Sequence, residues 1–140
     1  KVMLVTSNCS YVNENGEAVA FSVRKKKESE SCHYATNIFR IFMGSGNYPG
    51  CAMAFSAKLL KIVLPLPKYI ESHDLWIAKA ANLLASNYHI EQATLNRRIH
   101  NSNVSLRKRL FLIQVRSRLI FLISIAHICY RIVKIKVFNL

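Results

Sequence analysis

Asp74 is the only aspartate among the 140 residues, and it follows a histidine in the stretch ESHDLW, residues 71–76. A positioned, ionised carboxylate can take the proton of an attacking hydroxyl group, which becomes acidic in the transition state. The same residue could instead serve only a helix that begins here, because a carboxylate in the first turn contributes about 0.3–1 kcal/mol. The local sequence leaves both readings open.

A second group of chemically useful side chains lies in RRIHNSN, residues 97–103. His100 is a candidate metal ligand, since neutral imidazole is a common one, although a lone histidine is more often only hydrogen-bonded. No second ligand lies within a few residues, so the segment is not a self-contained metal site. If it is a strand, Arg97 and Arg98 point to opposite faces, and at most one faces a given site.

Gly50 is the third candidate. It follows Pro49 and precedes the apolar run CAMAF, residues 51–55. Glycine allows the backbone to approach a ligand closely, and a simple turn explains its presence equally well.

Periodic patterns indicate alternating strands and helices up to about residue 100, which is typical of an α/β fold. Helices are predicted over three segments with apolar residues at helical spacing: residues 35–44, 56–64 and 73–87. The third has an apolar stripe made of Ile77, Ala80, Ala81 and Leu84. Ser72 or His73 caps it, which places Asp74 in the first turn.

Strands are predicted over three further segments: residues 2–23, 51–55 and 88–100. The first is expected to form a hairpin that turns at Asn15-Gly16, a pair typical of tight turns. The second is expected to be short and buried.

Residues 106–140 contain apolar residues interrupted by Arg, Lys and His, with no Asp or Glu. Their longest run without a charged residue, 119–130, is shorter than the roughly 20 residues that cross a bilayer. Five basic residues fall on one side of the predicted helix: Arg109, Arg116, His127, Arg131 and Lys134. Such a helix can lie in the interface of an anionic membrane, or it can pack on the domain or on a partner subunit.

The net charge of +13 favours an anionic partner, such as a phospholipid surface, a phosphorylated substrate or nucleic acid. The densest basic run, RKKK at residues 24–27, contains no aromatic residue that could stack on a base. The pattern therefore does not favour a nucleic-acid partner.

Three segments, in their order and spacing, resemble the C-terminal half of family 2 glycosyltransferases: GCAMAF (50–55), HDLW (73–76) and RRIHNSNVS (97–105). That family shows a Gly-Cys-small-Met-apolar-Phe strand, a His-Asp-aromatic helix start and an Arg-x-His-x-x-Asn segment. The likeness is greatest to bacterial rhamnosyltransferase-like enzymes of surface polysaccharide synthesis. It covers nearly the whole chain, including the basic tail.

The resemblance implies the C-terminal part of a GT-A fold over residues 1–105, followed by a basic amphipathic tail over residues 106–140. It implies inverting transfer of a sugar from a nucleotide-diphospho-sugar to a saccharide or lipid-linked acceptor. The expected location is the cytoplasmic side, at the inner face of the cell membrane. A divalent cation, Mg²⁺ or Mn²⁺, is expected in the complete enzyme.

The resemblance also implies roles for single residues. Asp74 matches the catalytic base. The pocket for the acceptor and the donor sugar is expected to contain Gly50, Cys51, His73 and Trp76. The diphosphate and the metal are expected near Arg97, Arg98, His100 and Asn103, with His100 as the candidate metal ligand.

The chain departs from the family in the half that binds the nucleotide. Members hold the metal with an Asp-x-Asp motif, which a chain with one aspartate lacks, so no cation is expected on this chain alone. Lys1 opens a strand-like segment, so we expect a piece of a longer protein. Two alternatives stay open: a non-enzymatic basic module that binds anionic lipid or nucleic acid, and an inactive truncated glycosyltransferase.

Overall fold

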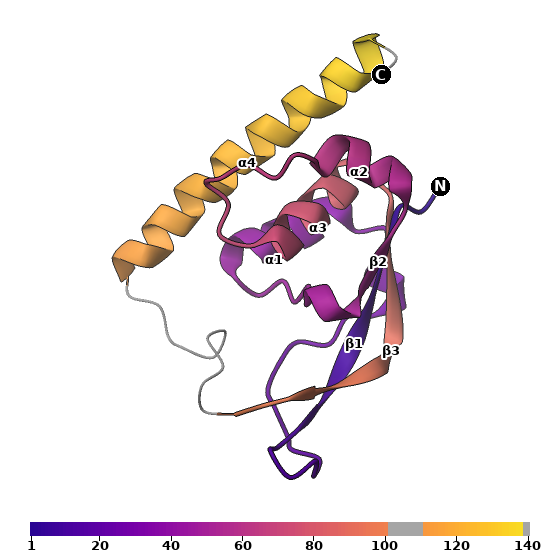
Figure 1. The fold of residues 1–140 in the computed structure, drawn as a ribbon, viewed down its shortest axis with the longest axis vertical. Helices are drawn as coiled ribbons and strands as arrows, with labels where there is room; N and C mark the ends of the chain where they lie inside the picture. Colours follow the sequence, from indigo (N-terminus) through magenta and orange to yellow (C-terminus); the bar gives the residue numbers. More distant parts are fainter. Residues whose placement is uncertain (101–110, 139–140) are drawn as a thin grey trace.

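The computed structural model describes residues 1–100 and 111–138, which form a mixed α/β fold (Figure 1). Its sheet has three strands: β1 (Leu4–Val12), β2 (Met53–Phe55) and β3 (Asn87–Arg98). The described residues form four α-helices: α1 (Tyr34–Met43), α2 (Ala57–Val63), α3 (His73–Leu83) and α4 (Phe111–Phe138). Two short 3₁₀ turns complete the series: η1 (Glu28–Glu30) and η2 (Gly50–Ala52). The prediction of an α/β class is confirmed.

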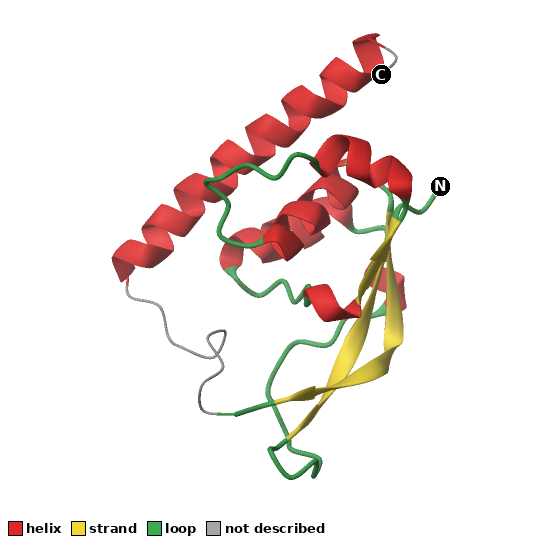
Figure 2. Cartoon of the chain, in the orientation of Figure 1, coloured by secondary structure: helices red, strands yellow, loops and turns green. Residues whose placement is uncertain are grey.

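Helices α1, α2 and α3 lie on one side of the sheet, and α4 crosses on the outside of α2 and α3 (Figures 1 and 2). Because α3 is enclosed by its neighbours, every residue from 76 to 82 is buried. The predicted stripe on this helix was therefore too narrow, since the sequence did not show that α4 covers the opposite face. The hydrophobic core gathers Leu4, Ile41, Tyr48, Leu59, Ile62, Val63, Trp76, Ile77, Ala78, Ala80, Ala81 and Ile128.

Strand β1 is central, with β2 antiparallel on one edge and β3 parallel on the other. The β1–β3 ladder runs along the whole of β1, with register shifts on either side of Asn8. This register pairs Tyr11 with Arg97, so it brings the end of β3 alongside the end of β1. The parallel ladder thereby fixes where Arg97 lies in the fold.

The predicted hairpin over residues 2–23 is correct at its turn and wrong in its second strand. Asn13 Oδ1 accepts hydrogen bonds from the backbone N–H groups of Asn15 and Glu17, and Gly16 has a φ of 87°, which suits glycine. Beyond the turn, the sheet pairing is reduced to a single bridge between Val12 and Ala18. The chain then leaves β1, and the Asn8 side chain binds the backbone of Lys26 in place of a second ladder.

The shorter helices and strands lie where the sequence predicts them, with two differences in detail. Strand β2 is not buried as predicted, because it lies at the sheet edge with Ala54 and Phe55 exposed. Ser56 directly precedes α2, but its hydroxyl makes no capping hydrogen bond. Helix α1 ends at Gly44, in the left-handed conformation that favours glycine at this position.

The helix predicted for the tail is present as α4, which keeps Arg116, His127, Arg131 and Lys134 on one side, and part of that side turns toward the domain. Arg131 lies against the domain, where its guanidinium donates to the carbonyls of Ile62 and Pro65 and lies 5.4 Å from the Trp76 ring centroid. His127 Nδ1 lies 2.8 Å from the Tyr69 hydroxyl. Arg131 and His127 therefore point toward the domain, and Arg109 lies outside the described residues.

Candidate functional site

The carboxylate of Asp74 reaches from the first turn of α3 across to the backbone of η2. Ser72 caps α3, since its hydroxyl accepts a hydrogen bond from the N–H of Leu75 at 3.3 Å. The Asp74 side chain is therefore not needed as a cap. Its Oδ2 accepts the N–H of Gly50 at 3.0 Å, and its Oδ1 lies 2.7 Å from His73 Nε2.

Gly50 leaves no room for a side chain of its own. A Cβ atom built at this position would lie 2.8 Å from Cγ and 3.0 Å from Oδ2 of Asp74. The glycine lets its N–H reach the carboxylate at hydrogen-bonding distance, which is the close backbone approach that glycine permits. This contact favours a positional role for Gly50 over that of a simple turn residue.

A buried polar network lies beneath the Gly50 turn. The Tyr48 hydroxyl is 3.2 Å from His89 Nε2, and Asn87 Nδ2 approaches the same nitrogen at 2.8 Å. Asn82 Nδ2 donates to the Tyr48 hydroxyl at 3.4 Å. Burial, with a smaller contribution from Lys26, lowers the pKa of His89 to about 4, so the imidazole is neutral near pH 7.

Five of the residues expected in the site line one cleft of about 530 Å³: Gly50, Cys51, His73, Asp74 and Arg97. Asn47, from the loop that follows α1, lines it too. Segments far apart in the sequence, namely η2, the start of α3 and the end of β3, thus meet at this cleft. The cleft places one carboxylate, one imidazole and one guanidinium around a space large enough for a small ligand.

The other predicted residues do not line this cleft. Trp76 is fully buried in the core, where its indole N–H donates to the Val63 carbonyl at 3.0 Å. Arg98 is exposed, and His100 is half-buried near the end of the described segment. The alternation of strand side chains explains why Arg97 lines the cleft and Arg98 does not, as predicted. Asn103 lies outside the described residues.

The side chains of the cleft do not fit Mg²⁺ or Mn²⁺. Hard cations favour several oxygen ligands, usually with carboxylates among them. The cleft offers a single carboxylate, one oxygen of which already accepts the Gly50 N–H, next to a guanidinium. Within residues 1–100 and 111–138, no three His, Cys, Asp or Glu side chains gather as metal ligands, and His100 is in no such group.

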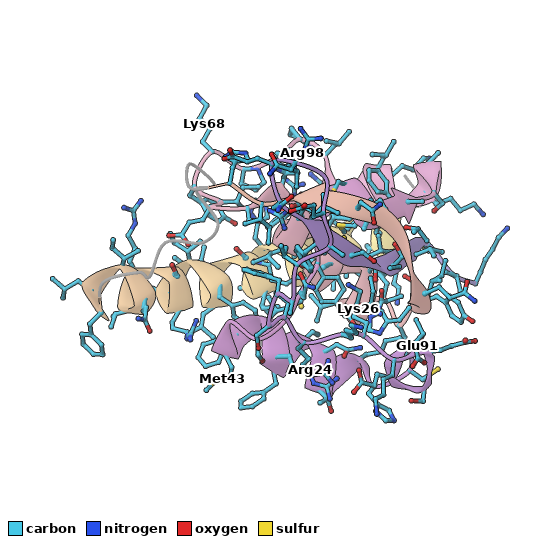
Figure 3. The ribbon with its side chains drawn as sticks, turned by 90° about the horizontal axis from the view of Figure 1, so that it is seen from below. Arg24, Lys26, Met43, Lys68, Glu91 and Arg98 are labelled. Atoms are coloured by element: carbon cyan, nitrogen blue, oxygen red, sulfur yellow. The ribbon has the colours of Figure 1, made fainter. Side chains whose placement is uncertain are left out.

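Sequence reasoning missed Lys26, which is buried beside the cleft loop (Figure 3). Asn8, also buried, accepts the N–H of Lys26 and donates to its carbonyl, which draws this segment against β1. The Lys26 ammonium donates to the Asn47 carbonyl at 2.7 Å. In the run RKKK, no local pattern distinguishes this lysine from its exposed neighbours.

Two buried lysines give the protein a testable pH dependence. Burial lowers the pKa of Lys26 and that of Lys79 from 10.5 to about 8. Between about pH 8 and 10 these two lysines bind more protons in the unfolded chain than in the folded chain, so their contribution to the free energy of unfolding rises with pH. We expect a rise of about 1–2 kcal/mol per lysine between pH 8 and 10, measured by urea unfolding.

The variant Lys26→Met distinguishes the contribution of Lys26 to this pH dependence from that of Lys79. It removes the buried charge and keeps much of the side-chain length, so the change in the free energy of unfolding between pH 8 and 10 is expected to be lower than in the parent by about 1–2 kcal/mol. Lys25→Met, at an exposed neighbour, serves as the control and is expected to leave the slope unchanged. Burial raises the pKa of Cys9 and of Tyr48, which opposes the rise in the parent protein, so the test is the difference between variants: the same dependence on pH in Lys26→Met and in the parent would contradict this account.

Comparison with family models, curated proteins and solved structures found no match to this chain.

Proposed function

We propose that the protein is a glycosyltransferase of the family 2, GT-A type, related to rhamnosyltransferase-like enzymes of surface polysaccharide synthesis. The proposal combines the sequence resemblance with one structural observation. The single aspartate of the chain is held by the Gly50 N–H at the edge of a cleft that Arg97 also lines. A carboxylate needed only to begin α3 would require neither contact, because Ser72 already caps that helix.

In the proposed reaction Asp74 is the general base. The oxygen of an acceptor hydroxyl bonds to the anomeric carbon of the donor sugar while its proton passes to the Asp74 carboxylate. The bond between that carbon and the diphosphate breaks, and the nucleoside diphosphate leaves with the electron pair. The Gly50 N–H orients the carboxylate by holding Oδ2, which leaves Oδ1 as the oxygen that takes the proton.

His73 controls access to that oxygen. Oδ1 is shielded from water and lies against the imidazole of His73, whose side chain is 69% exposed. Rotation of this exposed side chain would open Oδ1 to an acceptor hydroxyl. Arg97, which lines the same cleft, offers a positive charge to the leaving diphosphate, as preorganised cations do in phosphate chemistry.

The test uses the full-length protein as its cell makes it. The protein is incubated with a panel of nucleotide-diphospho-sugars and a detergent extract of membranes from the same cells, and nucleoside diphosphate release is measured. We expect one donor to be consumed only when the extract supplies an acceptor, with the sugar recovered in the lipid fraction. Consumption of no donor, or consumption that needs no acceptor, would contradict the proposal.

We further propose that α4 carries this enzyme to the inner face of the cell membrane, where lipid-linked acceptors lie. Within the described residues no helix has the length and apolar character to cross a bilayer. The outward side of α4 instead exposes a row of apolar side chains: Phe111, Leu112, Leu119, Leu122, Ile123, Tyr130, Val133 and Val137. At 3.6 residues per turn, Arg116 and Lys134 flank this row on one side and Lys136 on the other.

This arrangement suits a helix lying in the interface, with apolar side chains among the acyl chains and basic ones at the anionic headgroups. The double variant Leu119→Gln/Ile123→Gln is expected to lower binding to vesicles of phosphatidylglycerol and phosphatidylcholine by at least about tenfold, as measured by co-sedimentation. The paired control, Leu60→Gln/Leu64→Gln, alters exposed apolar residues of the α2 region. Equal binding by both double variants would contradict a specific role for α4.

A further inference from the structure

A second groove, of about 520 Å³, adjoins the Asp74 cleft. The two share Gly46, Asn47 and Arg97 in their walls, so they meet at these residues. The second groove extends along the end of β1 and the segment after the Asn15-Gly16 turn, where Tyr11 and Arg24 line it. A ligand with one hydroxyl at Asp74 would therefore extend past Arg97 toward Arg24.

Positive charge dominates this groove. None of the described residues that line it is acidic, whereas two of them, Arg24 and Arg97, carry a positive charge. Glu30 pairs with Arg24, but it is shared with Arg40, so two guanidinium groups face one carboxylate. The side chain of Glu30 is 12% exposed and that of Arg24 is 37% exposed, which leaves the guanidinium as the group that meets a ligand.

Two aromatic rings belong to the apolar part of the same lining. Tyr11 and Phe21 lie with ring centroids 4.8 Å apart and planes tilted by 44°. Phe21 is partly exposed. A sugar ring presents C–H groups on its faces and hydroxyls at its rim, so an aromatic surface bordered by hydrogen-bond donors suits a saccharide.

We propose that this groove is an acceptor subsite for an anionic saccharide, whose carboxylate or phosphate meets Arg24 while a sugar ring lies on Tyr11 and Phe21. The inference rests on the proposed glycosyltransferase function and specifies its acceptor. The anionic group, and not a neutral sugar alone, gives the affinity, because charge-assisted hydrogen bonds are stronger than neutral ones.

Binding is tested directly, without any transfer reaction. Three probes are titrated into the isotope-labelled full chain and followed by NMR chemical shifts: methyl β-D-glucuronide, glucose 1-phosphate and the neutral methyl β-D-glucoside. We expect at least one anionic probe to bind about tenfold more tightly than the neutral one, and to shift signals of Tyr11 and Phe21. Which of the two anionic probes binds more tightly shows whether the subsite prefers a carboxylate or a phosphate.

Variants locate the anion. Arg24→Gln is expected to remove the tenfold preference, and Arg24→Lys, which keeps a cation beside Glu30, is expected to retain most of it. Lys68→Gln removes one exposed charge on the opposite side of the view in Figure 3 and is expected to change nothing. Equal affinity for the neutral and anionic probes, or an unchanged preference in Arg24→Gln, would overturn the subsite.

The binding readout separates this inference from the enzymatic proposal. If probe binding depends on Arg24 while an Asp74 variant transfers sugar at the parent rate, the subsite is supported and Asp74 is excluded as the base. If the Asp74 variant loses transfer while the Arg24 variants bind the probes unchanged, the glycosyltransferase proposal is supported and the subsite is overturned.

Discussion

Replacing Asp74 by asparagine is expected to lower kcat for sugar transfer by about 100- to 10,000-fold, the range over which a positioned general base contributes. An amide cannot take a proton from the acceptor hydroxyl. Its carbonyl oxygen can still accept the Gly50 N–H, so the fold and donor binding are expected to survive. The measurement is single-turnover transfer at saturating donor, with donor affinity determined separately.

Glu14→Gln supplies the matched control, because it removes a carboxylate from the exposed turn after β1. That variant is expected to transfer sugar at the parent rate. Undiminished transfer by Asp74→Asn would exclude Asp74 as the base. An equal loss in both variants would show that the effect is not specific to the cleft.

Gly50→Ala is expected to lower transfer by on the order of 100-fold while changing the free energy of unfolding by less than about 1 kcal/mol. The new methyl group would occupy the space of the Asp74 carboxyl, 2.8 Å from its Cγ. Because that carboxyl is the end of a flexible side chain, it can rotate away at little cost to the fold. Transfer kinetics and urea unfolding of the same preparation measure the two effects.

Two comparisons identify the cause of the Gly50→Ala effect. Gly46→Ala places its methyl group 3.0 Å from the backbone of Ile41, which cannot rotate away, so that variant is expected to lose stability. The double variant Gly50→Ala/Asp74→Asn is expected to be no slower than Asp74→Asn alone, because both changes act on one group. Additive losses would mean that Gly50 acts on the reaction by another route.

The local elements that position Asp74 could be predicted from the sequence. Ser72, Asp74 and the apolar spacing that follows them predict the start of α3, and Gly44 predicts the end of α1. These signals are short-range, since capping and left-handed glycine positions depend on a few neighbouring residues. The alternation within β3 likewise predicted that only one of Arg97 and Arg98 would face a given site.

The predictions that failed depend on contacts between distant segments. Trp76 lies two residues after Asp74 in the sequence, and its burial depends on Val63 and on Arg131 of α4. The second strand of the hairpin is lost because Asn8 binds the backbone of Lys26 through its side chain. Neither pairing produces a periodic signal in the sequence.

The second groove also depends on such long-range contacts. Arg24 stands in a run of four basic residues, and Arg97 lies more than seventy positions away along the chain. The parallel register of β1 with β3 brings Arg97 to Tyr11, and the turn after β1 brings Phe21 to the same ring. The cleft could therefore be anticipated only through resemblance, and the groove only from the fold.

The central claim is tested most directly in the cell that makes the protein, by replacing it with the Asp74→Asn variant and analysing lipid-linked saccharides by mass spectrometry. The account predicts that a saccharide one sugar shorter than the normal product accumulates, while the variant protein is present at its normal level. An unchanged set of lipid-linked saccharides, with the variant present, would contradict the assignment of this protein as a glycosyltransferase that uses Asp74.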